Sequence, residues 1–114
     1  MESVEVRLEK FIEKNKSKIE EIGAQNGKIK EVLAIINNTK SNKNNFFVID
    51  GIWAHEKALN NNIEVDSFIF CKEIITSHEA MNLIESFFER AKKTYQVSLK
   101  TFMKLKLDFC QITH

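Results

Sequence analysis

Proline is absent from this chain of 114 residues, and glycine and cysteine are rare. With only three glycines, the chain has no glycine-rich loop of the kind that cradles phosphate groups. Its two cysteines fit a reducing intracellular compartment and would pair only by accident of the fold. The missing proline, beside abundant lysine and asparagine, fits an A/T-biased genome at least as well as it fits a function. A single lysine or asparagine is therefore weak evidence for a functional site.

Long apolar runs and an excess of charge are also missing. No apolar run approaches the roughly 20 residues that a membrane-spanning helix needs. The 17 Lys and Arg against 16 Asp and Glu leave a net charge of +1, so any basic surface must be local. The acidic, amphipathic start MESVEVRLEKFIEK is not expected to be a signal peptide. With 43% hydrophobic and 29% charged residues, the composition indicates one soluble globular domain.

The first part of the chain has helical periodicity. Residues 2–22 predict an amphipathic helix, ended by Gly23, whose apolar stripe consists of Leu8, Phe11, Ile12, Ile19 and Ile22. Polar residues interrupt this stripe, so we expect residues 1–25 to form an N-terminal helical appendage and residues 26–114 to form the domain proper. A second helix is expected over 27–38, followed by the polar, turn-rich loop NNTKSNKNN.

Strands and helices alternate through the rest of the chain. Buried strands are predicted at FFVI, VDSFIFC, TYQVS and, as a possible fourth, LDFCQIT. Helices are predicted over 51–60, after Ser77 and after Ser98, where the serines can cap them. This alternation predicts a three-layer α/β/α sandwich around a mostly parallel sheet of three or four strands, with an extra N-terminal helix.

Metal-binding and catalytic patterns are weak. His55 and His78 each begin a segment that resembles a zinc-protease helix, but neither has a second histidine four residues on. Cys71, Cys110 and His114 do not make a recognised zinc spacing either. We expect His55 to be a hydrogen-bonded core residue and Cys71 to be a buried thiol. The sequence predicts no nucleophile, general base or cofactor loop.

The stretch FFVIDGIWAHEKAL turns from a strand directly into a helix. Gly51 lets the backbone reverse, and Asp50 can cap the helix that follows. Spacing alone favours a purely structural role for this turn. Trp53 either packs under a neighbouring helix or stacks on a partner, and packing is the favoured prediction. The lysines around the polar loop are either a solvated face or a phosphate-contacting patch.

The segment from Asn26 to Cys71 resembles the N-terminal substrate-binding domain of the SpoU/TrmH-type RNA 2′-O-ribose methyltransferases. The family's Asn-Pro-x-Ile-Lys helix start is matched by Asn26, Ile29 and Lys30, and its Phe-x-x-Glu-Gly strand exit by Phe47, Asp50 and Gly51. The element pattern extends the resemblance over roughly residues 25–106. Three positions depart from it: Gly27 replaces the proline, Asp50 the glutamate, and Ser41 an arginine of the loop.

The resemblance implies the ribosomal L30e/L7Ae fold and a domain that positions ribosomal or transfer RNA. The RNA-binding residues it implies are Asn26, Lys28, Lys30, Lys40, Lys43 and Gly51. The family's catalytic domain, which binds S-adenosylmethionine, follows this domain and has no counterpart before His114. The chain alone is therefore expected to be no enzyme and to bind no cofactor or metal, whereas a parent protein would be an RNA 2′-O-methyltransferase.

The resemblance also implies a cytoplasmic protein that binds neither DNA nor membranes. Family members commonly dimerise through the catalytic domain, so we expect this fragment to be largely monomeric. An alternative remains open. The chain could be an L30e-like structural or protein-interaction module without an RNA role. In that case the N-terminal amphipathic helix would supply the contact surface.

Overall fold

Five short strands form one sheet, in the order β1-β4-β3-β5-β2, in a computed structural model that describes residues 2–37, 48–105 and 111–113. The strands are β1 (Ile19–Glu21), β2 (Val48–Asp50), β3 (Ser67–Phe70), β4 (Lys93–Gln96) and β5 (Gln111–Thr113). Strands β1, β4 and β3 run parallel, whereas β5 is antiparallel to both β3 and β2. The predicted α/β sandwich is confirmed, with five strands in place of the three or four expected.

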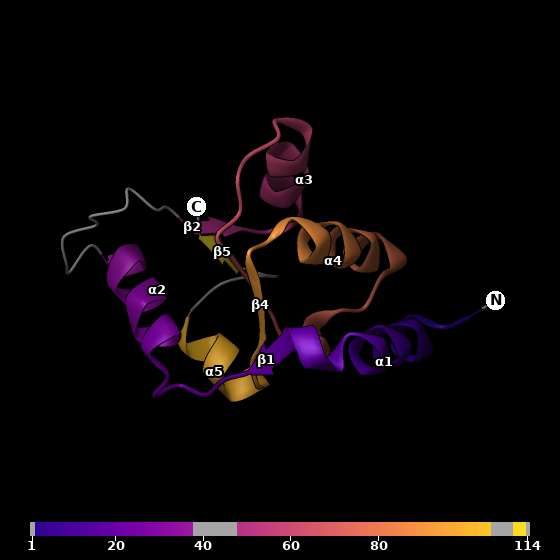
Figure 1. Cartoon of the computed structure of the whole chain (residues 1–114), viewed down its shortest axis with the longest axis horizontal. Helices are drawn as coiled ribbons and strands as arrows, with labels where there is room; N and C mark the ends of the chain where they lie inside the picture. Colours follow the sequence, from indigo (N-terminus) through magenta and orange to yellow (C-terminus); the bar gives the residue numbers. More distant parts are fainter. Residues whose placement is uncertain (1, 38–47, 106–110, 114) are drawn as a thin grey trace.

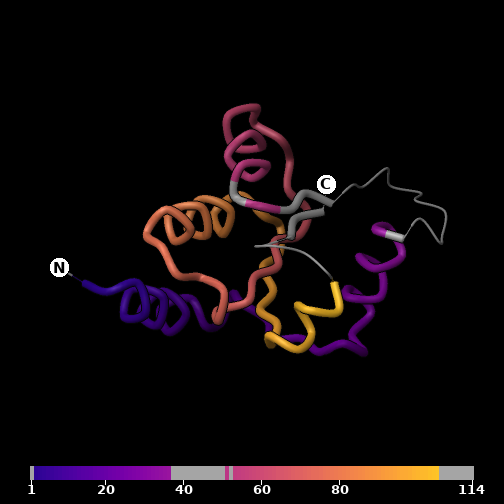
Figure 2. The backbone as a smooth tube through the Cα atoms, turned by 180° about the vertical axis from the view of Figure 1, so that it is seen from behind, coloured from indigo at the N-terminus to yellow at the C-terminus, as the bar shows by residue number. Residues whose placement is uncertain are grey.

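Helices cover both faces of the sheet (Figures 1 and 2). They are α1 (Val4–Lys14), α2 (Gly27–Asn37), α3 (Ile52–Asn60), α4 (His78–Arg90) and α5 (Leu99–Lys104), with 3-10 turns η1 (Lys16–Lys18) and η2 (Lys72–Ile74). Helices α1, α3 and α4 share one hydrophobic core with the sheet, and α2 and α5 share a second. Side chains of β3 alternate between these two cores, as a strand buried on both faces requires.

The alternation along β3 shows how the two cores are filled. Phe68 belongs to the α4 side, where its ring stacks on Phe87 with centroids 5.4 Å apart. Ile69 and Cys71 belong to the α2 side. All four side chains are fully buried, and burying each large apolar one stabilises the fold by about 2 kcal/mol. The apolar run SFIFC thus forms a central strand, as predicted.

The helix predicted over residues 2–22 is wrong beyond Lys14. The chain leaves α1 through η1 and forms β1, which pairs in parallel with β4. Ile19 and Ile22 explain the error, because a spacing of three residues fits one helix face but also fits opposite faces of a strand. Ile19 packs in the α4 core and Ile22 in the α2 core. Gly23 therefore follows a strand and ends no helix.

The predicted serine caps are confirmed. The Ala80 amide donates to Ser77 Oγ at 3.1 Å, and the Thr101 amide donates to Ser98 Oγ at 3.2 Å. On α5, Phe102 is buried and Met103 is exposed. The division into residues 1–25 and 26–114 stays a prediction, although α1 and β1 both pack against the rest of the fold.

Candidate nucleic-acid interface

Three predicted RNA-binding residues form the first turn of α2. Asn26 Oδ1 accepts a hydrogen bond from the Lys28 amide at 2.8 Å, and its carbonyl accepts from the Lys30 amide at 3.2 Å. The side chain of Asn26 therefore satisfies one backbone donor that a helix start leaves unpaired, and its carbonyl accepts the first regular hydrogen bond of the helix. Capping of α2 therefore explains the asparagine of the Asn-Gly-Lys-Ile-Lys segment structurally, whether or not the segment also binds RNA.

Lys28 is held by carboxylates. Its Nζ lies 3.4 Å from Asp66 Oδ2 and 3.4 Å from Glu31 Oε2, and only 17% of its side chain is exposed. Partial burial pushes the pKa of Asp66 upward, but the Ser67 hydroxyl and the ammonium groups of Lys28 and Lys92 outweigh this and hold the pKa below its usual range. A phosphate would have to compete with these carboxylates for Lys28.

Lys30 is exposed, and within the described part of the chain its ammonium makes no ion pair. It is thus the more available of the two lysines in this turn. Lys40 and Lys43 lie outside the described residues, as do Cys110 and His114. Their predicted roles stay predictions.

Gly51 forms the turn that joins β2 to α3. Its φ of +90° lies in the region that L side chains rarely adopt, so the glycine in this strand exit is required by the backbone itself. Gly51, and not Asp50, occupies the N-cap position of α3, and no side chain caps the helix there. The Gly51 carbonyl accepts from the His55 amide at 3.1 Å and from His55 Nδ1 at 2.7 Å. His55 is fully buried, which confirms it as a hydrogen-bonded core residue.

Trp53 is on the surface, so the favoured prediction that it packs under a helix is wrong. It is 72% exposed, the largest exposed fraction among the large hydrophobic residues described. Lys57 lies one helical turn further along α3, and its Nζ is 5.2 Å from the Trp53 ring centroid. The ammonium group of Lys57 thus lies over one face of the ring. An unpaired base can stack on the other face of such an exposed ring while a phosphate meets the cation. Stacking of a partner on Trp53 was only the alternative prediction, and no sequence pattern indicated Lys57.

The two parts of the predicted site lie at opposite ends of the sheet. Gln111 of β5 pairs with both Asp50 of β2 and Ile69 of β3, so β2 and β3 end at the same level of the sheet. Gly51 follows the carboxyl end of β2 and therefore lies at that level. Asp66, which holds Lys28, lies at the other end of β3. Four residues along a strand correspond to about 13 Å. No hydrogen bond or ion pair in the described ranges joins the start of α2 to Gly51.

Both arginines of the chain serve the fold. Arg7 on α1 reaches α4, where its guanidinium contacts His78 Nδ1 at 3.0 Å, Asn82 Oδ1 at 2.7 Å and Glu85 Oε1 at 2.5 Å. Arg90 donates to the Leu59 carbonyl at 3.2 Å and so satisfies an acceptor at the end of α3. A phosphate-contacting surface on the described part of the chain therefore depends on lysine, which binds as a point charge and not as a bidentate fork.

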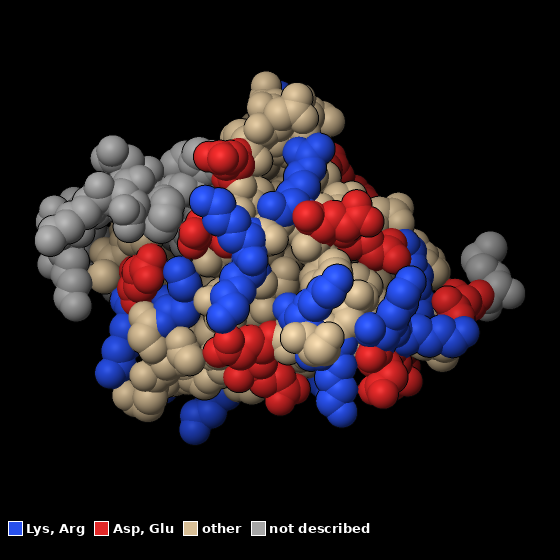
Figure 3. Space-filling view, in the orientation of Figure 1, with Lys and Arg blue, Asp and Glu red and all other residues tan. Residues whose placement is uncertain are grey.

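Charges of both signs are mixed over the surface. Figure 3 shows lysine and arginine side chains alternating with aspartate and glutamate across the face viewed, without one continuous basic patch. Within residues 2–37, 48–105 and 111–113, no three His, Cys, Asp or Glu side chains converge as a metal site would require. Likewise, no described helix is long and apolar enough to cross a bilayer.

Comparison with solved structures identifies the class of fold. Two crystal structures of an rRNA methyltransferase from Sinorhizobium meliloti match this chain. One has a TM-score of 0.65 and 11% identity over 84% of the chain. The other, whose protein is described as AdoMet bound, has a TM-score of 0.64 and 12% identity over 85% of the chain. At such identities the likeness establishes a shared fold and no more.

The chain spans 36% and 37% of those two methyltransferase chains. The shared fold therefore corresponds to a little over one third of each methyltransferase chain. No known family model matches the sequence, and no curated protein matches it.

Proposed function

We propose that this chain is the RNA-recognition domain of a ribosomal or transfer RNA 2′-O-ribose methyltransferase of the SpoU/TrmH type. In this proposal the domain positions RNA, and a further domain of the parent protein binds S-adenosylmethionine and transfers the methyl group. The parent protein would be cytoplasmic. RNA would be the partner, with no part for DNA or membranes. The fold likeness to an rRNA methyltransferase supports this class of function.

The observation that carries the proposal is the exposed ring of Trp53, two residues after the Gly51 turn, with the ammonium of Lys57 over one of its faces. An exposed tryptophan forgoes the stabilisation that burial would give, and its ring is open to stacking on a partner. Stacking an unpaired base on a tryptophan contributes about 1–3 kcal/mol to binding. Lys57 would add a phosphate contact at the same place.

The lysines around the loop would supply the second contact region. Lys30 is the exposed member at the start of α2, and Lys40 and Lys43 would extend it. Lys28 would contribute less, because Asp66 and Glu31 already neutralise it. Replacing all four lysines with glutamine should flatten the salt dependence of RNA binding, by about 0.9 in slope for each duplex phosphate that is no longer neutralised.

The test is a fluorescence anisotropy titration against a ribosomal RNA hairpin at several salt concentrations. We expect Trp53→Ala to weaken binding by about tenfold, with an unchanged salt slope, because stacking is not ionic. Met103→Ala is the matched control, since it removes another exposed apolar side chain on α5. Equal affinities for wild type and the Trp53 variant would contradict the proposal. An equal salt slope for wild type and the four-lysine variant would assign those lysines to a merely solvated face.

A further inference from the structure

A groove between α1 and the carboxyl ends of the parallel strands has not been assigned a role. It has a volume of about 530 Å³ and lies beside a second hollow of about 390 Å³ at the same end of the sheet. Five glutamates line it, from α1, from the end of β1 and from η2: Glu5, Glu9, Glu13, Glu21 and Glu73. Lys72 is the one cation among its described lining residues. We refer to this hollow as the α1 groove.

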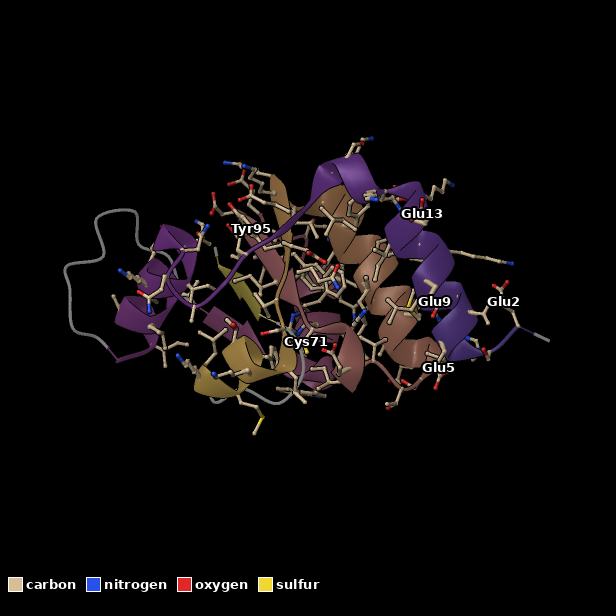
Figure 4. The ribbon with its side chains drawn as sticks, turned by 90° about the horizontal axis from the view of Figure 1, so that it is seen from below. Glu2, Glu5, Glu9, Glu13, Cys71 and Tyr95 are labelled. Atoms are coloured by element: carbon tan, nitrogen blue, oxygen red, sulfur yellow. The ribbon has the colours of Figure 1, made fainter. Side chains whose placement is uncertain are left out.

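The five carboxylates of the α1 groove lack ion-pair partners among the described residues. By contrast, Glu20 and Glu85 outside the groove are paired with Lys93 and Arg7. Figure 4 shows the side chains of Glu5, Glu9 and Glu13 following one another along α1. Successive members are four residues apart, which corresponds to a rise of about 6 Å along the helix.

Gln96 adds a polar group that also lacks a partner. It ends β4, is 7% exposed, and lines both the α1 groove and the adjoining hollow. Its backbone carbonyl accepts from the Ile22 amide at 3.0 Å, but its side-chain amide makes no hydrogen bond to the described residues. The amide atoms of Gln96 are not among the fully buried unpaired atoms of the described residues, so they open onto the groove, where a ligand's polar group can hydrogen-bond to them.

The floor of the groove is apolar. Leu8 and Ile75 are buried beneath the carboxylates, and Ile12 is half-buried beside them. A small polyamine would satisfy the charges but would leave this floor in water. A segment that carries both basic and apolar side chains would cover the floor and meet several carboxylates at once.

We propose that the α1 groove docks a basic, amphipathic segment of another protein. Its lysines or arginines would pair with Glu9, Glu13 and Glu21, a polar group would complete the Gln96 amide, and its apolar side chains would lie on Ile12. This partner site is independent of the proposed RNA contact and stands whether or not the chain binds RNA. The negative groove repels phosphate, so the two surfaces would not compete.

The probe is a fluorescein-labelled amphipathic peptide of about 15 residues, with Lys and Arg on one helical face and Leu on the other. A peptide of the same composition in scrambled order is compared with it. The groove variant is Glu9→Gln, Glu13→Gln, Glu21→Gln. Its matched control is Glu31→Gln, Glu64→Gln, Glu89→Gln, which changes the net charge equally at exposed sites outside the groove.

We expect the groove variant to bind the peptide about tenfold more weakly and the control variant to bind it nearly as wild type does. Gln96→Ala should weaken binding about threefold without changing the charge. An equal loss of peptide affinity in the groove and control variants would show that only the net charge matters and would overturn the proposal. Equal binding of the scrambled peptide, or displacement by spermine at a similar concentration, would also overturn it. If the groove variant fails to fold, the result for Gln96→Ala decides.

Discussion

Lys28, on the first turn of α2, pairs at 3.4 Å with Asp66, which lies immediately before β3. The pair connects a helix on one face of the sheet to the start of its central strand, across 38 residues of sequence. It also accounts for the lowered pKa of Asp66, together with the Ser67 hydroxyl. Lys28 therefore has a role in the fold that a purely RNA-contacting lysine would not have.

The first prediction concerns this pair. Because the folded-state pKa of Asp66 is depressed, its contribution to stability is present above the unfolded pKa near 3.8 and is lost as pH falls through the folded pKa. Lys28→Met removes the cation, so we expect a loss of up to about 1 kcal/mol at neutral pH and a rise in the pKa of Asp66. Urea unfolding and carboxyl NMR titration measure the two effects. Lys30→Met is the control, and an equal loss there would contradict a specific pair.

Arg7 is the second prediction. It connects α1 to α4 through His78, Asn82 and Glu85, so Arg7→Ala should lower the free energy of unfolding by about 2 kcal/mol. Arg7→Lys should recover only a minor part, because an ammonium cannot reproduce the fork. Lys10→Ala, which removes an exposed pair with Glu2, should cost little. Thermal melts compare the three variants. Equal effects of Arg7→Ala and Lys10→Ala would show that Arg7 is only a surface charge.

A pair of glutamates gives the third prediction. Hydrogen bonding with the neighbouring Glu79 carboxyl raises the pKa of Glu56, and desolvation and the like charge of Glu79 raise it further. A raised folded-state pKa means that the pair stabilises the fold below the unfolded pKa of 4.5, and that this contribution is lost as pH rises through the folded pKa. Glu56→Gln should therefore raise the thermal midpoint at neutral pH and leave it nearly unchanged in acid.

Glu64→Gln is the control for this experiment, since Glu64 is an exposed glutamate just beyond α3. A rise of equal size in both variants would reflect net charge alone. The same midpoint shift for Glu56→Gln at neutral and acid pH would remove the glutamate pair from the explanation.

Cys71 provides the fourth prediction. Burial and the hydrogen bond from its Sγ to Glu73 raise the pKa of this thiol to about 11. The experiment uses a Cys110→Ser background, in which Cys71 is the remaining cysteine. At neutral pH the folded protein should react with iodoacetamide at least about a hundredfold more slowly than the same protein with Thr76→Cys added. That substitution places a thiol at an exposed position nearby. Glu73→Gln should lower the pKa of Cys71. Fast labelling of folded Cys71 would contradict the buried thiol.

The fifth prediction is that this chain does not bind S-adenosylmethionine. The sequence has three glycines and no cofactor loop, and in the proposed function that cofactor binds to a further domain. Isothermal titration calorimetry is expected to show no heat beyond dilution. Stoichiometric micromolar binding would revive an enzymatic function for the chain itself.

The sequence predicts the parallel core because local patterns determine it. SFIFC is apolar on both faces, and a serine precedes each of α4 and α5. Prediction from the sequence fails where contacts between residues far apart in the chain determine the structure. The identity of β1 depends on pairing with β4, over 70 residues away, and Ile19 and Ile22 fit a helix equally well in isolation. The exposure of Trp53 likewise depends on which elements surround α3, which no local pattern encodes.

The candidate site was predictable to a smaller degree. The need for glycine at position 51 is a local backbone property, and the sequence around it suggested the turn. The neutralisation of Lys28 by Asp66 follows from the packing of α2 on the sheet and has no local signal. For the same reason the α1 groove was not anticipated, since its walls come from α1, β1, β4 and η2.

The pairing of β1 with β4 determines how the molecule can be shortened for experiments. Ile19, Glu20 and Glu21 are in register with Thr94, Tyr95 and Gln96. A chain begun at Asn26 would leave the backbone amides and carbonyls along that side of β4 without partners. Such an uncovered strand is a template for other chains, and the shortened protein would tend to form aggregates. Recombinant fragments intended for crystallisation should therefore keep the residues from Ser3 onward.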